Sequence, residues 1–200
     1  YVKSPKEMAE LFPEQPEAIL NTVRIAERCD VDLSTEENHA PVVKVIHPGQ
    51  APVYDGGDRT TWFKGYCNQF ELQPFDSNKD SEISADELKT SCDLALRDLC
   101  EAGLIWRYGP EGVTPHIRAR LDRELGILAD KLISAYFLIV WDFVNWARQR
   151  GIPTNARGSG VGTMVGYVLG LSNACPEKYG LLFERFTDPD RAEYPDIDID

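Results

Sequence analysis

Three aspartates near the end of the chain have the residue type and spacing to bind divalent cations. They alternate with isoleucines in Pro195–Asp200, which reads PDIDID. Side chains of a β-strand point alternately to opposite faces, so Asp196, Asp198 and Asp200 would share one face and the isoleucines would face a core. Carboxylates two residues apart on a strand lie roughly 6–7 Å from one another, which suits two cations about 3.5–4 Å apart. Without cations the carboxylates would repel one another, and we expect one or more of their pKa values to rise. The alternative is a solvated edge strand with an acidic outer face.

A glycine-rich segment about 36 residues before the aspartates has the composition of a phosphate-binding loop. Arg157–Gly162 reads RGSGVG and precedes an apolar stretch that predicts a helix to about Leu169. Backbone N–H groups at a helix start bind phosphate oxygens, and glycine lets the backbone approach them closely. Ser159 and Thr163 would add hydroxyl donors, and Arg157 a bidentate guanidinium. The segment matches neither a Walker A loop nor a Rossmann fingerprint, and the alternative is tight packing of a helix against small residues.

A second candidate metal site is an acidic loop in the middle of the chain. Asp76–Glu87 places oxygen-bearing side chains at loop positions 1, 3, 5, 7, 9 and 12, the ligand spacing of an EF-hand calcium loop. The candidate ligands are Asp76, Asn78, Asp80, Glu82 and Glu87. Two features depart from the pattern, because Ser81 stands where glycine is usual and Pro74 argues against an entering helix. We therefore expect weaker calcium binding than in a glycine-containing loop, and the alternative is an acidic helix N-terminus.

Composition and charge indicate a globular chain and bear on its cellular compartment and its binding partners. Of its 200 residues, 42% are hydrophobic and 27% are charged, and no apolar run reaches the length of about 18 residues that a membrane span needs. The five cysteines form no CxxC pair, which argues against a disulfide framework or a zinc site and for a reducing cytoplasm. The net charge of −12 is unusual for a nucleic-acid binder, but residues 103–170 carry 8 Lys/Arg against 5 Asp/Glu. Because the chain begins with Tyr1 and ends inside an expected strand, we expect a fragment of a longer protein.

Helices are expected to dominate the elements that position these groups, within an α+β fold class. Capping boxes, prolines at first helical positions and apolar periodicity predict five helices. They cover residues 4–12, 16–29, 84–99, 114–132 and 136–149. The last of them is apolar almost all round, which suits a buried central helix or a strand passing into a helix, with Asp142 paired or at a surface opening. Prolines and glycines make residues 34–75 irregular, with β-like pieces at 42–46 and 61–63.

Four segments in a fixed order carry a resemblance to a known family. They are Ala135–Phe143 (AYFLIVWDF), Ala156–Gly162 (ARGSGVG), Tyr179–Phe186 (YGLLFERF) and Pro195–Asp200 (PDIDID). In this order and spacing they closely resemble the bacterial replicative DNA polymerase III alpha subunits, the C-family polymerases. The resemblance is dense over residues 91–200.

The resemblance also divides the chain into three parts. Residues 1–33 look like the C-terminal helices of the family's PHP domain. Residues 34–90 match poorly and look like an irregular insertion that contains the EF-hand-like loop at residues 76–87. Residues 91–200 resemble the N-terminal part of the palm, which implies a helix-rich fragment of a nucleotidyltransferase fold of the polymerase-beta type.

The resemblance implies that the aspartates are the catalytic metal ligands. Asp196 and Asp198 match the first two of three catalytic aspartates, which hold two magnesium ions in the family. Asp200 matches the next acidic position. Because the third catalytic aspartate would lie beyond residue 200, the fragment alone is expected to be inactive.

The resemblance assigns the glycine-rich segment to the incoming nucleotide. Gly158 and Ser159 match the pair that holds the triphosphate, and Arg157 and Arg185 match basic residues expected to face the phosphates. The approach to the loop departs from the family's Gly-Pro-Gly-Arg-Gly-Ser, since residues 154–156 read Thr-Asn-Ala.

The implied activity is template-directed DNA synthesis, in which a primer 3′-hydroxyl attacks a deoxynucleoside triphosphate. The implied partners are primer–template DNA, deoxynucleoside triphosphates and, through regions outside this chain, other replicase subunits such as the sliding clamp. Two alternatives stay open at this point. One is a calcium-responsive binding module that acts through residues 76–87, and the other is a nucleotidyltransferase that is not a polymerase.

Overall fold

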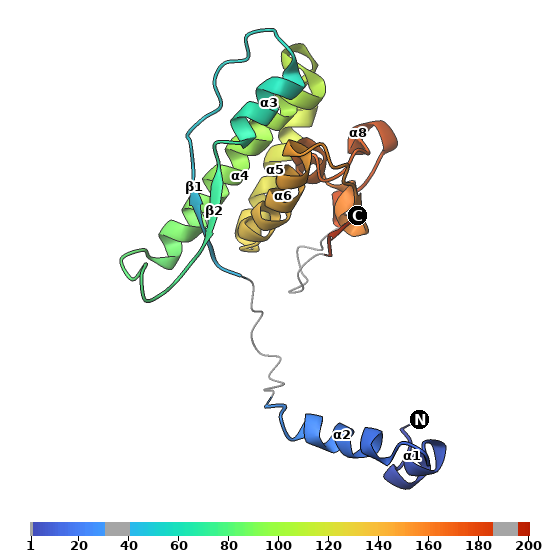
Figure 1. Cartoon of the computed structure of the whole chain (residues 1–200). Helices are drawn as coiled ribbons and strands as arrows, with labels where there is room; N and C mark the ends of the chain where they lie inside the picture. The colour runs from blue at the N-terminus through green and yellow to red at the C-terminus, as the bar shows by residue number, and fades with distance from the viewer. Residues whose placement is uncertain (1, 31–40, 186–195) are drawn as a thin grey trace. The chain divides into compact units, whose positions relative to one another are not determined.

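The structure is a computed structural model that describes residues 2–30, 41–185 and 196–200 (Figure 1). The chain divides into two compact units, residues 1–39 and 40–200. The described residues are helix-rich with two small sheets, which confirms the α+β class. No helix in these described ranges is long and apolar enough to cross a membrane.

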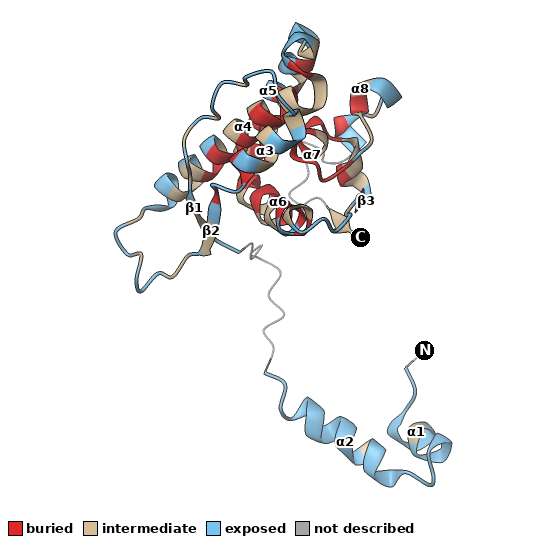
Figure 2. Cartoon of the chain, turned by 45° about the horizontal axis from the view of Figure 1, so that its top comes forward, coloured by how far each residue is buried: buried red, intermediate tan, exposed pale blue. Residues whose placement is uncertain are grey.

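The first unit contains two helices, α1 (Pro5–Leu11) and α2 (Pro16–Ala26). A capping box begins α1, because the Ser4 hydroxyl accepts from the Glu7 backbone N–H while the Glu7 carboxylate accepts from the Ser4 N–H at 2.7 Å. Both predicted helices are therefore confirmed. Neither helix contains a buried residue, so the apolar side of α2 has no core within this unit (Figure 2).

The second unit is built around α4 (Ala85–Tyr108), whose buried side contacts α3 (Arg59–Cys67), α6 (Ser134–Gln149) and α7 (Met164–Leu169). A second capping box begins α4, since the Glu87 carboxylate accepts from the Ser84 N–H at 2.8 Å. The buried residues lie on the sides of these helices that face one another (Figure 2).

The contact between α4 and α7 depends on a glycine. A Cβ atom added at Gly103 of α4 would lie 2.3 Å from the Val168 carbonyl oxygen of α7. No side chain fits at that distance, so any substitution of Gly103 would push α7 away from α4. The close approach matters for the site because α7 follows directly on the glycine-rich segment.

The segment before α4 is part of this core, and its described part is more regular than predicted. Residues 47–58 form no helix or strand, as expected, and the β-like piece at 42–46 is confirmed as a strand, whereas residues 59–74 contain a helix and a second strand. Strands β1 (Val43–Ile46) and β2 (Glu71–Pro74) pair antiparallel, with Val43 opposite Pro74 and Ile46 opposite Glu71. The piece at residues 61–63 is helix α3 rather than strand. Asp58 caps this helix, and its Phe63 and Tyr66 are 1% and 2% exposed.

Helix α5 (Pro115–Asp130) follows a short 3-10 turn, η1 (Pro110–Gly112). The predicted apolar stripe of α5 is buried at Ile117, Leu121, Leu125 and Leu128. The stripe ends there, because Leu132 lies beyond the helix and is 62% exposed. The helix prediction is thus confirmed, with its C-terminus two residues earlier than expected.

The prediction that α6 is buried all round is wrong. Phe137, Trp141 and Val144 are buried on one side, but Phe143 and Trp146 are 64% and 55% exposed on the other. Asp142 borders a pocket of about 460 Å³, as expected for a residue at a surface opening. Burial of its carboxyl raises the pKa of Asp142.

Short elements follow α6 and carry the candidate site. Strand β3 (Ala156–Arg157) leads into the 3-10 turn η2 (Ser159–Gly162) and α7. Helix α8 (Pro176–Tyr179) and the 3-10 turn η3 (Phe183–Arg185) come next. The described chain ends in β4 (Asp198–Ile199).

Candidate functional site

The candidate site forms where β3 and β4 pair antiparallel. The register sets Arg157 opposite Asp198 and Ala156 opposite Ile199. Reciprocal backbone bonds between Asn155 and Asp200, of 3.1 and 3.0 Å, extend the pairing by one residue. Because directly opposed residues project from the same face of a sheet, this register places Arg157 on the aspartate face.

The isoleucines of the aspartate segment face the core, as the alternation predicts. Ile197 and Ile199 pack against the buried residues of the second unit. The Ile197 N–H donates to the Tyr136 hydroxyl of α6 at 3.2 Å. Burial raises the pKa of Tyr136, so this hydroxyl stays neutral at ordinary pH. The strand is therefore fixed on the core from one side, which leaves the carboxylates on the other.

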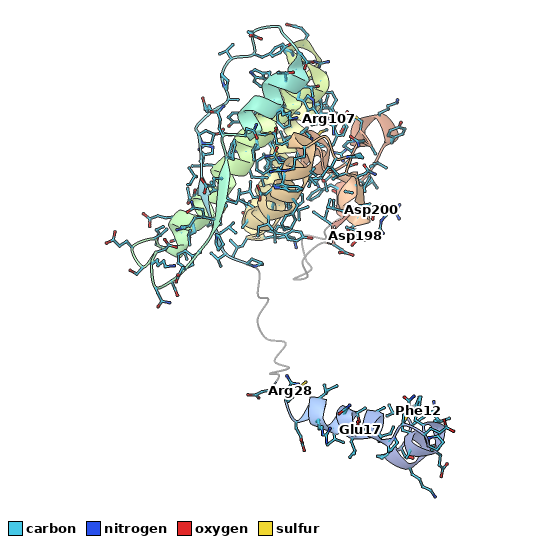
Figure 3. All side chains as sticks on the ribbon, viewed as in Figure 1. Phe12, Glu17, Arg28, Arg107, Asp198 and Asp200 are labelled. Atoms are coloured by element: carbon cyan, nitrogen blue, oxygen red, sulfur yellow. The ribbon has the colours of Figure 1, made fainter. Side chains whose placement is uncertain are left out.

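Arg157 neutralises part of the acidic face. Its Nε and Nη2 donate to the two carboxylate oxygens of Asp200, the second at 3.0 Å, and its Nη1 lies 3.5 Å from Asp198 Oδ2. The hydrogen bond from Arg157 lowers the pKa of Asp200 and raises the pKa of the guanidinium. Asp200 does not show the expected rise in pKa, because its contact with this cation outweighs the effect of burial. Figure 3 labels Asp198 and Asp200 at the C-terminal end of the chain.

The glycine-rich segment reaches the same strand. The Ser159 hydroxyl donates to the Asp196 carbonyl oxygen at 3.2 Å. Gly158 has a φ of +82°, and a Cβ at this position would lie 3.9 Å from Asp198 Oδ2. Glycine is favoured there because L side chains rarely adopt that backbone conformation. The structure thus brings Arg157, Gly158 and Ser159 next to the aspartate strand.

The start of α7 does not offer its N–H groups to a phosphate, and this part of the sequence prediction is wrong. Thr163 is fully buried, and its Oγ1 accepts from the Gly166 N–H at 2.9 Å and donates to the Gly160 carbonyl at 3.0 Å. The Val165 N–H donates to a carboxylate oxygen of Glu124 at 3.0 Å. The protein therefore supplies its own anion at this helix N-terminus, and a phosphate would have to contact Gly158 and Ser159.

A buried ion pair fixes the glycine-rich segment from behind. Arg120 donates to Glu124 at 3.0 Å and to Glu177 at 2.8 Å. The same guanidinium donates to the carbonyls of Gly162 at 3.1 Å and Leu181 at 2.8 Å. Arg120 consequently joins α5 to η2, α8 and the segment before η3.

Glu124 is the buried member of this pair and was not among the predicted site residues. Its exposed fraction is 0%. Burial raises the pKa of Glu124, while the N–H groups of Met164 and Val165 and the cation Arg120 act in the opposite direction. The only sequence signal for the pair is the i,i+4 spacing of Arg120 and Glu124 on one helix, which is common on solvated helices.

Arg185 is exposed on the turn η3, at the limit of the described residues. This turn contacts η2, which contains Ser159. Arg185 is therefore on an element next to the loop, but its role toward phosphate stays a prediction.

The local excess of positive charge does not form a free basic surface. Arg118 donates to Glu101 at 2.7 Å, and Arg123 pairs with Glu184. Arg107 donates to the carbonyls of Tyr167 and Ser172, both at 2.9 Å. These arginines stabilise the fold around the site, and among the described residues Arg157 is the cation paired with Asp198 and Asp200.

The predicted calcium loop lacks the turn and the entering helix of an EF-hand. Strand β2 precedes it instead of a helix. Ser81 has no positive φ, so the left-handed turn expected at loop position 6 is not formed. The exiting helix α4 is present, as predicted.

The loop's carboxylates are bonded to protein groups. Asp80 pairs with Lys44 at 2.6 Å, and Asp76 pairs with Lys79 at 3.2 Å. The Glu87 carboxylate is occupied in the capping box of Ser84. Calcium would have to displace these contacts. Asn78 and Glu82 are exposed, and calcium binding by this set stays a prediction.

The aspartate face fits magnesium in chemistry but supplies only part of a coordination shell. Carboxylate oxygens are the hard ligands that magnesium takes, usually one or two per ion beside water and phosphate. Asp196 is exposed, and the Asp198 side chain is 45% exposed. Within residues 2–30, 41–185 and 196–200, no three His, Cys, Asp or Glu side chains are grouped to hold a metal ion. Asp196 and Asp198 would therefore need a further ligand from elsewhere.

Comparisons with known proteins agree with the resemblance. Residues 94–200 match the family described as the bacterial DNA polymerase III alpha NTPase domain. The whole chain aligns with DNA polymerase III subunit alpha of Chlamydia muridarum (36% identity), Treponema pallidum (36%) and Borreliella burgdorferi (37%). It spans 15%, 14% and 14% of those proteins, respectively.

These relatives are bacterial proteins of one class, the alpha subunits of DNA polymerase III. The chain belongs to the bacterial DNA polymerase III alpha family.

Proposed function

We propose that the chain is part of a template-directed DNA polymerase of bacterial chromosome replication. In this proposal residues 91–200 are the N-terminal part of a palm of the polymerase-beta type, and residues 1–33 close a PHP domain. The observation that carries the proposal is the pairing of β3 with β4, which sets Arg157 opposite Asp198. It supports one site with a carboxylate side and a phosphate side.

The chain's residues would hold the reacting groups as follows. Asp196 and Asp198, with a further ligand from elsewhere in the protein, would hold two magnesium ions, which would supply Lewis-acid activation of the primer hydroxyl and positive charge for the phosphoryl oxygens. Gly158 and Ser159 bind triphosphate oxygens through their backbone N–H groups. Arg157, with Arg185 from η3, provides positive charge where charge develops in the transition state. The primer hydroxyl is the nucleophile, so none is required from the protein.

The supporting geometry lies in the second unit. Tyr136 fixes the aspartate strand from the core side, and Arg120 fixes η2 through the Gly162 carbonyl. Fixed groups stabilise charge without reorganising during the reaction. We expect the full-length protein to act in the cytoplasm on primer–template DNA and deoxynucleoside triphosphates, with the sliding clamp as a partner of other regions.

Primer extension by the full-length protein tests the proposal. We expect incorporation of the deoxynucleotide complementary to the template and none without a template strand. Template-independent addition would instead indicate a nucleotidyltransferase that is not a polymerase. Absence of any nucleotide incorporation in magnesium would contradict both.

Calcium binding by residues 76–87 is a second candidate function, favoured by the spacing of the five predicted ligands. Because Glu87 caps α4 and Asp80 pairs with Lys44, we expect weak binding, with a dissociation constant on the order of 1 mM. Calorimetric titration of calcium into the wild type and a Glu87→Gln variant measures it. Micromolar binding that Glu87→Gln abolishes would show a dedicated calcium site.

A further inference from the structure

Arg157 contacts the aspartates through its side chain and is continuous with the glycine-rich segment through its backbone. Its guanidinium donates to both oxygens of Asp200 and lies 3.5 Å from Asp198 Oδ2. Its backbone continues directly into Gly158 and Ser159. The Arg157 side chain is 60% exposed, so packing does not restrict it to the aspartates.

The position of this guanidinium has an electrostatic consequence for metal binding. A cation held by Asp198 would lie within a few ångströms of the Arg157 charge, and the two would repel each other. The repulsion is moderate because the face is open to solvent and is screened by salt. A triphosphate has the opposite effect, since it offers the guanidinium the same bidentate hydrogen bonding that Asp200 does.

We propose that Arg157 couples metal binding to nucleotide binding by exchanging the aspartates for the triphosphate of the incoming nucleotide. On Asp198 and Asp200 the guanidinium weakens the affinity of the aspartates for magnesium. On the triphosphate it strengthens nucleotide binding and leaves the carboxylates to the metal. This inference rests on the proposed function, because it requires metal at the aspartates and phosphate at the loop.

The geometry allows the exchange without a change of fold. Backbone bonds between Asn155 and Asp200 hold the two strands together independently of the Arg157 side chain. The Ser159 hydroxyl holds the loop on the strand through the Asp196 carbonyl. Only the Arg157 side chain has to move.

The test measures magnesium affinity and nucleotide dependence on the full-length protein. Competition of magnesium against Mn²⁺, followed by electron paramagnetic resonance, gives the affinity in the absence of nucleotide. The fraction of Mn²⁺ lost in an Asp196→Asn, Asp198→Asn double variant defines the ions bound at this site. The KM for the deoxynucleoside triphosphate is measured separately by single-nucleotide insertion.

We expect Arg157→Ala to change the two quantities in opposite directions. Magnesium affinity should increase about three- to tenfold, while the KM for the nucleotide rises at least tenfold because a charge-assisted bidentate contact is lost. Arg157→Lys keeps the positive charge, so its magnesium affinity should stay as low as that of the wild type. Arg150→Ala removes an exposed arginine of the same charge that bonds to the Trp146 carbonyl, and it should change neither quantity.

Two results would overturn the inference, and they are distinguishable. Unchanged or weaker magnesium binding in a folded Arg157→Ala variant would show that Arg157 only bridges the strands, and the proposed function would stand. If the double aspartate variant loses no bound Mn²⁺, the metal site itself is wrong, and the proposed function fails together with the inference.

Discussion

Replacement of Asp196 or Asp198 by asparagine is expected to abolish primer extension by the full-length protein. Asparagine keeps the shape of the side chain but removes the charge that a divalent cation requires, so the contribution of metal to the transition state is lost. A loss of several kcal/mol in the transition state corresponds to a rate reduction of about 10³-fold or more. Single-turnover insertion of one nucleotide measures it.

Replacement of Asp200 by asparagine is expected to reduce nucleotide insertion less than replacement of Asp196 or Asp198. Its carboxylate is held by Arg157 rather than directed at the other aspartates, so we expect Asp200→Asn to reduce insertion about tenfold or less. DNA binding should stay close to the wild type in all three variants, because most of the DNA contacts are expected outside this chain. Insertion that remains within tenfold of wild type in Asp196→Asn and Asp198→Asn would contradict their role as metal ligands.

Loss of Glu124 is expected to destabilise the second unit strongly. Removing one partner of a buried ion pair typically costs about 3–5 kcal/mol. Glu124→Ala leaves Glu177 as the only carboxylate paired with Arg120 in the described structure, and it also leaves the N–H of Val165 without its acceptor. We therefore expect a loss of about 3–5 kcal/mol in the free energy of unfolding. Glu124→Gln keeps one acceptor and should lose about 2 kcal/mol, the contribution of a hydrogen bond to a charged group.

The matched control lies on the same helix. Arg118 pairs with Glu101, and their side chains are 49% and 34% exposed. Exposed pairs contribute little, so Arg118→Ala should cost less than about 1 kcal/mol. Urea unfolding followed by tryptophan fluorescence compares the three variants. A Glu124→Ala variant no less stable than Arg118→Ala would show that the buried pair does not support the loop.

Capping residues and apolar periodicity predicted most of the helices. The helix at residues 59–67 was missed, because it forms through tertiary packing. Ser4–Glu7 and Ser84–Glu87 satisfy helix N-termini within four residues, so sequence alone defines them. Thr61 to Phe63 has β-branched and aromatic residues typical of a strand. The structure makes this piece helical because Asp58 caps it and because Phe63 and Tyr66, three residues apart, are buried together.

The individual segments of the site could be predicted from the sequence, but the contacts between them could be predicted only in part. Alternation in the aspartate strand correctly placed the isoleucines toward the core. The resemblance to the family brought the glycine-rich segment and the aspartates into one site, which spacing alone did not require. The anion at the start of α7 could not be read from the sequence, because Glu124 is 41 residues away from Val165 and looks like one member of an ordinary surface pair.

In the proposed site, residues 157–159 form the phosphate side and the aspartates form the metal side. Electron–nuclear double resonance on the full-length protein, with Mn²⁺ in place of magnesium and a bound deoxynucleoside triphosphate, tests it most directly. We predict a ³¹P coupling large enough to require direct coordination of Mn²⁺ by phosphate, and we expect Asp196→Asn and Asp198→Asn to remove it. Mn²⁺ that depends on these aspartates but shows no ³¹P coupling would contradict the claim.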